Sequence, residues 1–236
     1  MSLSLDGPRG FFMISYIPLT FFGIIGVVGL AFFVHGFVNR QKIYAAFTDL
    51  ASSLSGHAGR SAIWAYPYLS GSFEGRPIKI FFHTSENHTV SVLNLVVEMG
   101  LSSQDRLLLL QKEGFREPKP EGKERLAEEV GPEVPVPGIP FDVRSKDASR
   151  AQEILSHEEL RRDLSSFSPY NQILLWDGSL IAGKQFEGVA ETLPESMLAT
   201  LGRIGGLARR FESLASKSSL GRSDGTGNPQ PVRQGS

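Results

Sequence analysis

The chain contains no cysteine, and its 236 residues carry a formal net charge of only -1. The absence of cysteine excludes disulfide bonds, thiolate zinc sites and cysteine nucleophiles. The near balance of charges leaves no global basic field for nucleic acid, so we expect no nucleic-acid partner. A domain of this size is stable without disulfides on either side of a membrane, so the missing cysteine does not identify the compartment.

Charge is also missing from one long segment, since residues 10–39 contain no Asp, Glu, Lys or Arg. Its apolar centre runs from Phe11 through Val34 and exceeds the roughly 20 residues that an α-helix needs to cross the hydrocarbon layer of a bilayer. We therefore predict a transmembrane helix over residues 11–38 that contacts the lipid bilayer. A short tail, residues 1–10, precedes it.

The alternative for this apolar run is a cleaved secretory signal. The apolar core of a signal has about 7–15 residues, follows a basic segment and ends at small residues. Here only Arg9 precedes a much longer run, and Phe, Phe, Val and His occupy positions 32–35. The glycines inside the run recur at every third position, so the G-x-x-x-G dimerisation pattern is absent. These features favour an anchor.

The basic residues near the run predict its orientation. Arg9 precedes the run, whereas Arg40 and Lys42 follow it and Arg60 lies further on. The more positive flank tends to remain in the cytoplasm. We therefore expect a single-pass protein of the cell inner membrane whose C-terminal domain is cytoplasmic.

A second helical pattern follows the apolar run directly. Its apolar positions have the i, i+3, i+4, i+7, i+8 spacing of one helical face: Ile43, Ala46, Phe47, Leu50, Ala51 and Leu54. This spacing predicts an amphipathic juxtamembrane helix, residues 39–56, that closes at Gly56. Helices that lie on a bilayer surface are usually rich in Lys and Arg, and this one is not, so packing against the following domain is favoured. His57, in the glycine-containing segment that follows, is expected to lie in a flexible joint.

From Ala65 the apolar period changes to the alternation that is typical of strands. Four strands are predicted: Tyr66–Phe73, Pro77–Thr84, Thr89–Glu98 and Arg106–Gln111. We expect them to form an antiparallel meander. In the third strand the apolar face changes between Val92 and Leu93, which predicts either a bulge or a strand that is covered on both faces.

Residues 113–140 interrupt this pattern with Glu, Lys, Gly and six prolines. Proline removes a ladder donor and breaks helices, so an exposed excursion is expected. We place the excursion within one domain, because the second half of the chain offers too few strands for a sheet of its own.

The second half predicts a strand, two short helices, a hairpin and a long closing helix. Their positions are a strand at Phe141–Arg144, helices capped by Asp147 and Ser156, hairpin strands Gln172–Trp176 and Leu180–Gln185, and a last helix capped by Thr192. Asp177-Gly178 is the strongest hairpin signal in the chain. From Lys217 the composition is Ser, Gly, Pro and Arg, which predicts a disordered tail over residues 217–236.

The fold class that follows is α+β: an N-terminal transmembrane helix, then one antiparallel-sheet domain, residues 57–216, with packed helices and a long C-terminal helix. Three segments carry a likeness to known proteins: residues 71–76 (GSFEGR), residues 141–147 (FDVRSKD) leading into Ile154-Leu155, and residues 175–180 (LWDGSL). On these segments, between about Phe11 and Leu214, the chain resembles bacterial single-pass membrane-anchored proteins classified as a domain of unknown function. The resemblance is structural and implies no activity.

Motifs of catalysis are missing as well. The sequence has neither a Gly-x-Ser-x-Gly elbow nor a phosphate-binding loop, and we predict no catalytic residue and no cofactor. One cluster, His83, Glu86 and His88, surrounds a predicted turn and has side chains suited to a divalent metal. A polar hairpin tip explains the same residues more simply, so we expect no metal there.

Two functions remain open from the sequence. The first is a non-enzymatic, membrane-anchored protein whose domain binds another protein of unknown identity, as an accessory or assembly subunit. The alternative is a membrane-tethered enzyme or small-ligand-binding domain that uses the turn from His83 to His88 or a pocket beside Trp176. A concave pocket on which apolar and titratable side chains converge would favour the alternative.

Overall fold

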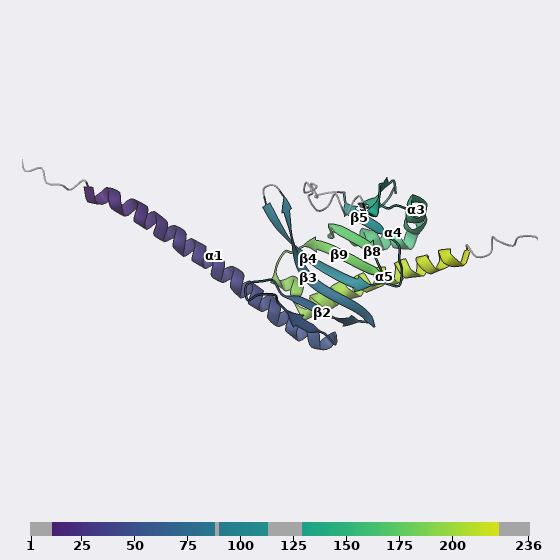
Figure 1. The fold of residues 1–236 in the computed structure, drawn as a ribbon, viewed down its shortest axis with the longest axis horizontal. Helices are drawn as coiled ribbons and strands as arrows, with labels where there is room; N and C mark the ends of the chain where they lie inside the picture. Colours follow the sequence, from purple (N-terminus) through teal and green to yellow (C-terminus); the bar gives the residue numbers. More distant parts are fainter. Residues whose placement is uncertain (1–10, 88–89, 113–128, 222–236) are drawn as a thin grey trace, which may run out of the picture.

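The computed structural model describes residues 11–87, 90–112 and 129–221. The first element, α1 (Phe11–Ser53), is one continuous helix that projects from the folded domain (Figure 1). The sequence predicted two helices here, divided near Asn39. Arg40 and Lys42 interrupt the apolar composition, but neither residue breaks a helix, so the apolar run and the amphipathic segment share one axis.

The domain end of α1 forms part of the hydrophobic core, as the amphipathic spacing predicted. All six residues of the predicted face are buried: Ile43, Ala46, Phe47, Leu50, Ala51 and Leu54. The helix ends differently from the prediction, because Ser55 and not Gly56 has the left-handed conformation, with φ of 47°. Gly56 is required for another reason. A Cβ at Gly56 would lie 2.2 Å from the carbonyl oxygen of Ser70, so the close approach of α1 to the sheet needs glycine.

One antiparallel sheet of nine strands forms the centre of the domain (Figure 1). Its strands are β1 (His57–Gly59), β2 (Tyr68–Phe73), β3 (Arg76–Asn87), β4 (Val90–Gly100), β5 (Leu107–Gln111), β6 (Glu133–Val134), β7 (Phe141–Arg144), β8 (Gln172–Trp176) and β9 (Ser179–Gln185). Their order in space is β1-β2-β3-β4-β9-β8-β5-β7-β6.

One residue row of the inner face of the sheet crosses all nine strands. Successive Cα partners in this row are Ala58, Leu69, Ile80, Val97, Ala182, Ile173, Leu109, Val143 and Val134. All of them belong to the main hydrophobic core or pack against it. Burying this face against helices removes a continuous apolar surface from water, which is the main favourable term in folding.

The first three strands of the predicted meander are confirmed as β2, β3 and β4, but the fourth is not where the meander placed it. β5 does not pair with β4, because the β8-β9 hairpin lies between them and β9 takes the β4 edge. The prediction of the hairpin itself was correct, with Asp177 and Gly178 both at positive φ in its turn. In β4 the register with β3 is unbroken from Met99 to Val90, so no bulge is present. Residues 94–97 are instead buried in succession, which confirms the alternative of a strand covered on both faces.

Four helical elements complete the inner layer: α3 (Ala148–Ser156), α4 (Glu158–Ser165), the 3-10 turn η1 (Val189–Thr192) and α5 (Pro194–Gly221). Asp147 caps α3 as predicted, since its carboxylate accepts a bond from the Arg150 backbone N–H at 2.8 Å. The two other predicted caps are wrong. His157 and not Ser156 precedes α4, and the Thr192 hydroxyl donates to the Val189 carbonyl inside η1 while Pro194 opens α5.

Two boundaries differ from the composition-based predictions. Within the excursion of residues 113–140, β6 adds a two-residue strand to the sheet by pairing with β7. Residues 113–128 lie outside the described residues. At the other end α5 continues to Gly221, beyond the predicted start of the tail at Lys217. Only proline and glycine break a helix strongly, and none occurs between Leu207 and Leu220.

Candidate functional site

The predicted metal cluster falls mostly outside the part of the chain that can be described. His83 is exposed on β3, whereas His88 and the Glu86 side chain lie outside the described residues. In the described residues no group of three His, Asp or Glu side chains is placed to hold a metal ion. The expectation that this turn is a polar tip therefore stays a prediction.

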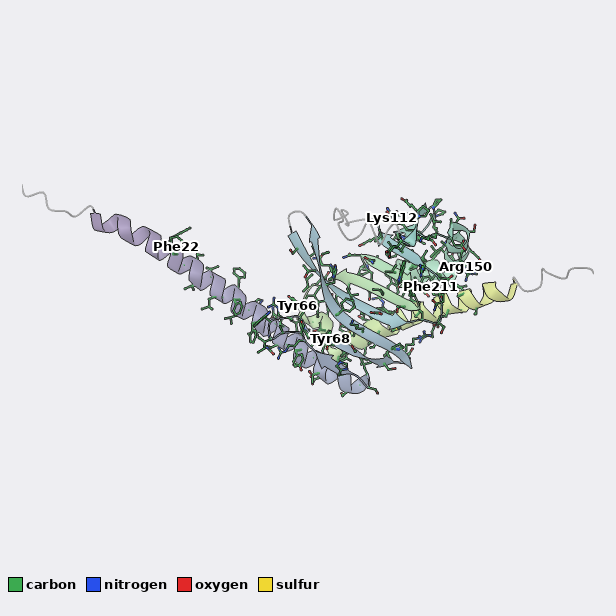
Figure 2. All side chains as sticks on the ribbon, in the orientation of Figure 1. Phe22, Tyr66, Tyr68, Lys112, Arg150 and Phe211 are labelled. Atoms are coloured by element: carbon green, nitrogen blue, oxygen red, sulfur yellow. The ribbon has the colours of Figure 1, made fainter. Side chains whose placement is uncertain are left out.

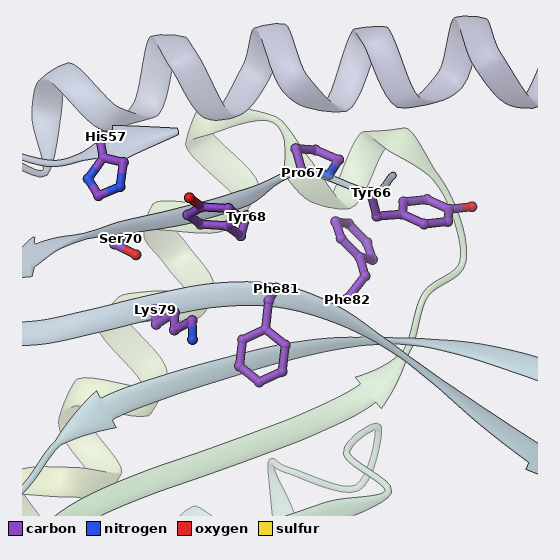
Figure 3. A pocket seen from close by; sticks show the side chains of 8 residues that line it. All are labelled: His57, Tyr66, Pro67, Tyr68, Ser70, Lys79, Phe81 and Phe82. Carbon is purple, nitrogen blue, oxygen red and sulfur yellow. The ribbon is translucent and has the colours of Figure 1, made fainter. Parts of the chain in front are cut away.

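A different part of the molecule carries a cavity. It is an open groove of about 540 Å³ at the β1-β2-β3 edge of the sheet. Its lining comes from β1, β2, β3 and the segment before β2 (Figure 3): His57, Tyr66, Pro67, Tyr68, Ser70, Lys79, Phe81 and Phe82.

Strand register explains why four of these residues, His57, Ser70, Lys79 and Phe81, lie on one face, whereas Tyr66 and Phe82 pack against the core side of the sheet. His57, Ser70 and Lys79 are successive Cα partners across β1, β2 and β3, so their side chains leave the sheet on the same face. Phe81 lies two residues after Lys79 and shares that face. The expectation that His57 lies in a flexible joint was wrong, because His57 begins a strand and its ring packs edge-on against Tyr68 with centroids 6.1 Å apart.

The polar groups in the groove are basic or uncharged. The Lys79 ammonium nitrogen lies 5.4 Å from the centre of the Phe81 ring, a cation-π distance. None of the lining residues that the structure describes is acidic. Lysine, imidazole, hydroxyl groups and aromatic faces together suit a partner that brings acidic or aromatic side chains.

The same residues do not form a nucleophile and base pair. Ser70 and His57 are direct neighbours across β1 and β2, yet no hydrogen bond joins them among the described side chains. Nucleophilic catalysis requires the base within hydrogen-bond reach of the nucleophile and a third group that orients the base. In the groove as described, no carboxylate is available for that third role.

One face of the Trp176 ring is covered by the protein itself. The Arg106 guanidinium carbon lies 4.4 Å from the centre of the Trp176 ring, and the same guanidinium pairs with Asp177 at 2.8 Å. One face of the indole is thus covered, which leaves less room for a ligand there than the sequence suggested.

These observations define an α+β protein with a long apolar N-terminal helix and an open groove on its sheet. No family model matches the chain, and no curated protein matches it either. Among solved structures, the mycobacterial trehalose monomycolate transport factor A, TtfA, is similar with 12% identity and a TM-score of 0.45, over 74% of this chain and 95% of that chain.

Proposed function

We propose that the chain is a single-pass membrane protein whose α+β domain binds another protein as a non-enzymatic accessory or assembly subunit. The observation that carries the anchor is the exposure of α1. Its segment Phe21–Ser53 is long and apolar enough to cross a membrane, and none of the most apolar window in that segment is buried in the protein. A bilayer would cover side chains such as Phe32, which is 75% exposed.

The continuity of α1 supports an anchor over a cleaved signal. The helix passes without interruption from the exposed apolar residues into Ile43 and Phe47, which are fully buried in the domain core. A signal is released at a cleavage site of small residues that follows its apolar core. The corresponding residues here are bulky and helical.

The groove supports the protein-binding role. Its aromatic side chains are of the types that are enriched in protein interfaces, and the Lys79 ammonium adds a positive charge that orients an acidic partner. We accordingly assign the groove as the surface for a partner with acidic or aromatic side chains.

Purification from detergent-solubilised native membranes tests this function. The wild type should retain a partner in stoichiometric amount, and the double variant Lys79→Gln/Phe81→Ala should lose it. A matched control is Leu198→Ala on α5, which removes an exposed apolar side chain away from the groove and should keep the partner. A partner that the groove variant still retains would show that another surface is used.

The orientation is part of the same proposal. Arg40, Lys42 and Arg60 lie on the domain side of the apolar run and favour a cytoplasmic domain at the inner membrane. Protease added outside intact cells should then spare everything after Asn39. Digestion of the domain in intact cells would reverse the orientation.

A membrane-tethered enzyme or ligand-binding domain is the second candidate, and one observation favours it. His57 and Lys79 converge on one groove with several aromatic rings, which is the convergence of titratable and apolar groups expected of a ligand site. Under this second function, purified protein should bind a small acidic or aromatic metabolite, and Lys79→Gln should weaken that binding. If it does so, while the wild type retains no protein partner, this second function replaces the first.

A further inference from the structure

Two large apolar side chains are exposed next to each other in the segment between β1 and β2. Ile63 is 57% exposed and Trp64 is 66% exposed. They occupy the centre of a tight turn that the Ala65 backbone N–H closes by donating to the Ala62 carbonyl at 3.0 Å. A turn normally carries polar residues or glycine and proline. Two exposed apolar side chains in this turn therefore indicate a surface that another molecule covers.

The turn is attached to α1 on both sides. Before the turn, the Arg60 guanidinium carbon lies 4.5 Å from the centre of the Tyr44 ring. After the turn, the Arg40 guanidinium carbon lies 4.9 Å from the centre of the Tyr66 ring. Figure 2 shows Tyr66 beside α1, where the helix joins the domain. The turn is therefore held at a fixed height along the helix axis.

That height coincides with the end of the apolar run. The uncharged segment closes at Asn39, and Arg40 and Tyr44, which hold the turn, follow closely on the same helix. An α-helix rises about 1.5 Å per residue, so Arg40 lies about 3 Å and Tyr44 about 9 Å beyond Val38 along the axis, and the turn is held between these two levels. A bilayer is about 40–45 Å thick with its headgroups and about 30 Å thick without them, so the headgroup layer on each side is about 5–7 Å thick.

We propose that the turn Ala62–Ala65 is a second membrane contact, in which Ile63 and Trp64 enter the headgroup layer of the bilayer that α1 spans. Tryptophan concentrates in this layer because its ring is apolar and its N–H is polar. The guanidinium groups of Arg40 and Arg60 lie on either side of the turn and suit anionic headgroups. The inference rests on the proposed function, because it requires that α1 spans the membrane.

The contact also decides how α1 is inclined. A predicted span of residues 11–38 is longer than the roughly 20 residues that a perpendicular helix needs, and a long span adapts by tilting. Tilting toward the turn brings Ile63 and Trp64 into the bilayer, whereas tilting away lifts them into water. The pair thus selects one tilt direction and with it one orientation of the domain.

The chain has two tryptophans, which makes the test direct. Full-length Trp176→Phe protein is reconstituted into vesicles of phosphatidylcholine and phosphatidylglycerol, so that the fluorescence reports Trp64 alone. Trp64→Phe protein is the matched control, because its remaining Trp176 lies under Arg106 on the sheet. Quenching is measured with phosphatidylcholine brominated on its acyl chains and with aqueous iodide.

We expect a blue-shifted Trp64 emission that brominated lipid quenches and iodide reaches poorly, and a Trp176 emission that brominated lipid leaves unchanged. Full quenching of the Trp64 fluorescence by iodide would overturn the proposal, because Trp64 would then lie in water. Quenching by neither agent would overturn it too, because Trp64 would then be covered by protein. Flotation of the same vesicles distinguishes a failure of this turn contact from a failure of the proposed membrane anchor. Protein that floats while Trp64 shows no lipid quenching overturns this inference alone, and protein that does not float overturns the anchor as well.

Discussion

Arg76 and Glu212 form a bidentate ion pair that joins the start of β3 to α5, with nitrogen to oxygen distances of 2.7 and 2.5 Å. The Glu212 carboxylate also accepts the Ser102 backbone N–H at 2.7 Å, and Arg76 donates to the Gly100 carbonyl at 3.2 Å. Distant segments of the chain therefore meet at one pair of charges. The hydrogen bond from Arg76, with further help from Ser102, lowers the pKa of Glu212 from 4.5 to about 2.

The first prediction concerns the pH dependence of stability. Because the pKa of Glu212 is lower in the folded state, the pair stabilises the fold above about pH 4.5, and this contribution is lost as the pH falls toward 2. The variant Glu212→Gln should lose about 1–2 kcal/mol of unfolding free energy at pH 7. Its stability should also change less than that of the wild type between pH 5 and 3, as measured by urea unfolding at each pH. The exposed-site control Glu158→Gln should stay within about 0.5 kcal/mol, and an equal loss in both variants would contradict the role of the pair.

The second prediction compares two glycines. A Cβ at Gly56 would lie 2.2 Å from the Ser70 carbonyl oxygen and 2.7 Å from the Gly71 Cα, so Gly56→Ala forces α1 away from β2. We expect a loss of about 1–3 kcal/mol. A Cβ at Gly202 in α5 would have nothing within 4 Å, so Gly202→Ala should raise stability by up to about 1 kcal/mol through helix propensity. Thermal unfolding of both variants tests this prediction, and equal changes in their melting temperatures would contradict it.

A third prediction addresses the anchor and the core part of α1. Replacing Ile25 with Arg should reduce membrane insertion, since a charge near the helix centre costs about 2.5–3.5 kcal/mol on insertion scales, and Ile25→Leu should insert normally. A chain that begins at Arg40 should be soluble and folded, because it keeps the buried residues Ile43 to Leu54. A chain that begins at Gly56 should aggregate. Carbonate extraction and gel filtration distinguish these outcomes, and a folded chain from Gly56 would show that α1 is dispensable for the core.

The fourth prediction tests the hairpin tip of β3 and β4. Replacing His83 and His88 together with Asn should change stability by no more than the roughly 0.5 kcal/mol typical of surface substitutions. If a metal were bound there, the same change should abolish the bound ion and lower the melting temperature, because binding to the folded state stabilises it. Elemental analysis of wild-type protein together with thermal unfolding provides the measurement.

Local patterns predicted local elements well. The alternation around Asp177-Gly178 placed the β8-β9 hairpin to within one residue, because turn chemistry and side-chain period are properties of a few neighbouring residues. The buried face of α1 from Ile43 to Leu54 was predicted for the same reason. Patterns of this kind report how a segment folds and which side faces the core.

Partners far apart in the sequence were predicted less well. Leu107 to Leu110 are four consecutive leucines, so alternation assigns no face to β5 and no preference between β4 and β8. The groove was missed for a related reason. His57, Ser70 and Lys79 come from three strands, and only their register brings them to one face. The adjacent pair Ile63-Trp64 was a signal in the sequence that could have been used, since two bulky apolar residues follow Arg60 soon after the predicted anchor.

The unbroken course of α1 through Asn39 has a mechanical consequence. A domain on a flexible linker samples many directions, whereas this one turns only when its helix turns, since the helix enters the core at Ile43 without a joint. One residue inserted near Asn39 would rotate the domain by about 100° about the helix axis and raise it by about 1.5 Å. Four inserted residues would add about one full turn and nearly restore the direction in which the domain faces. A ladder of alanine insertions at this point would therefore change the direction in which the groove opens with a period of about 3.6 residues, independently of the affinity of the groove itself.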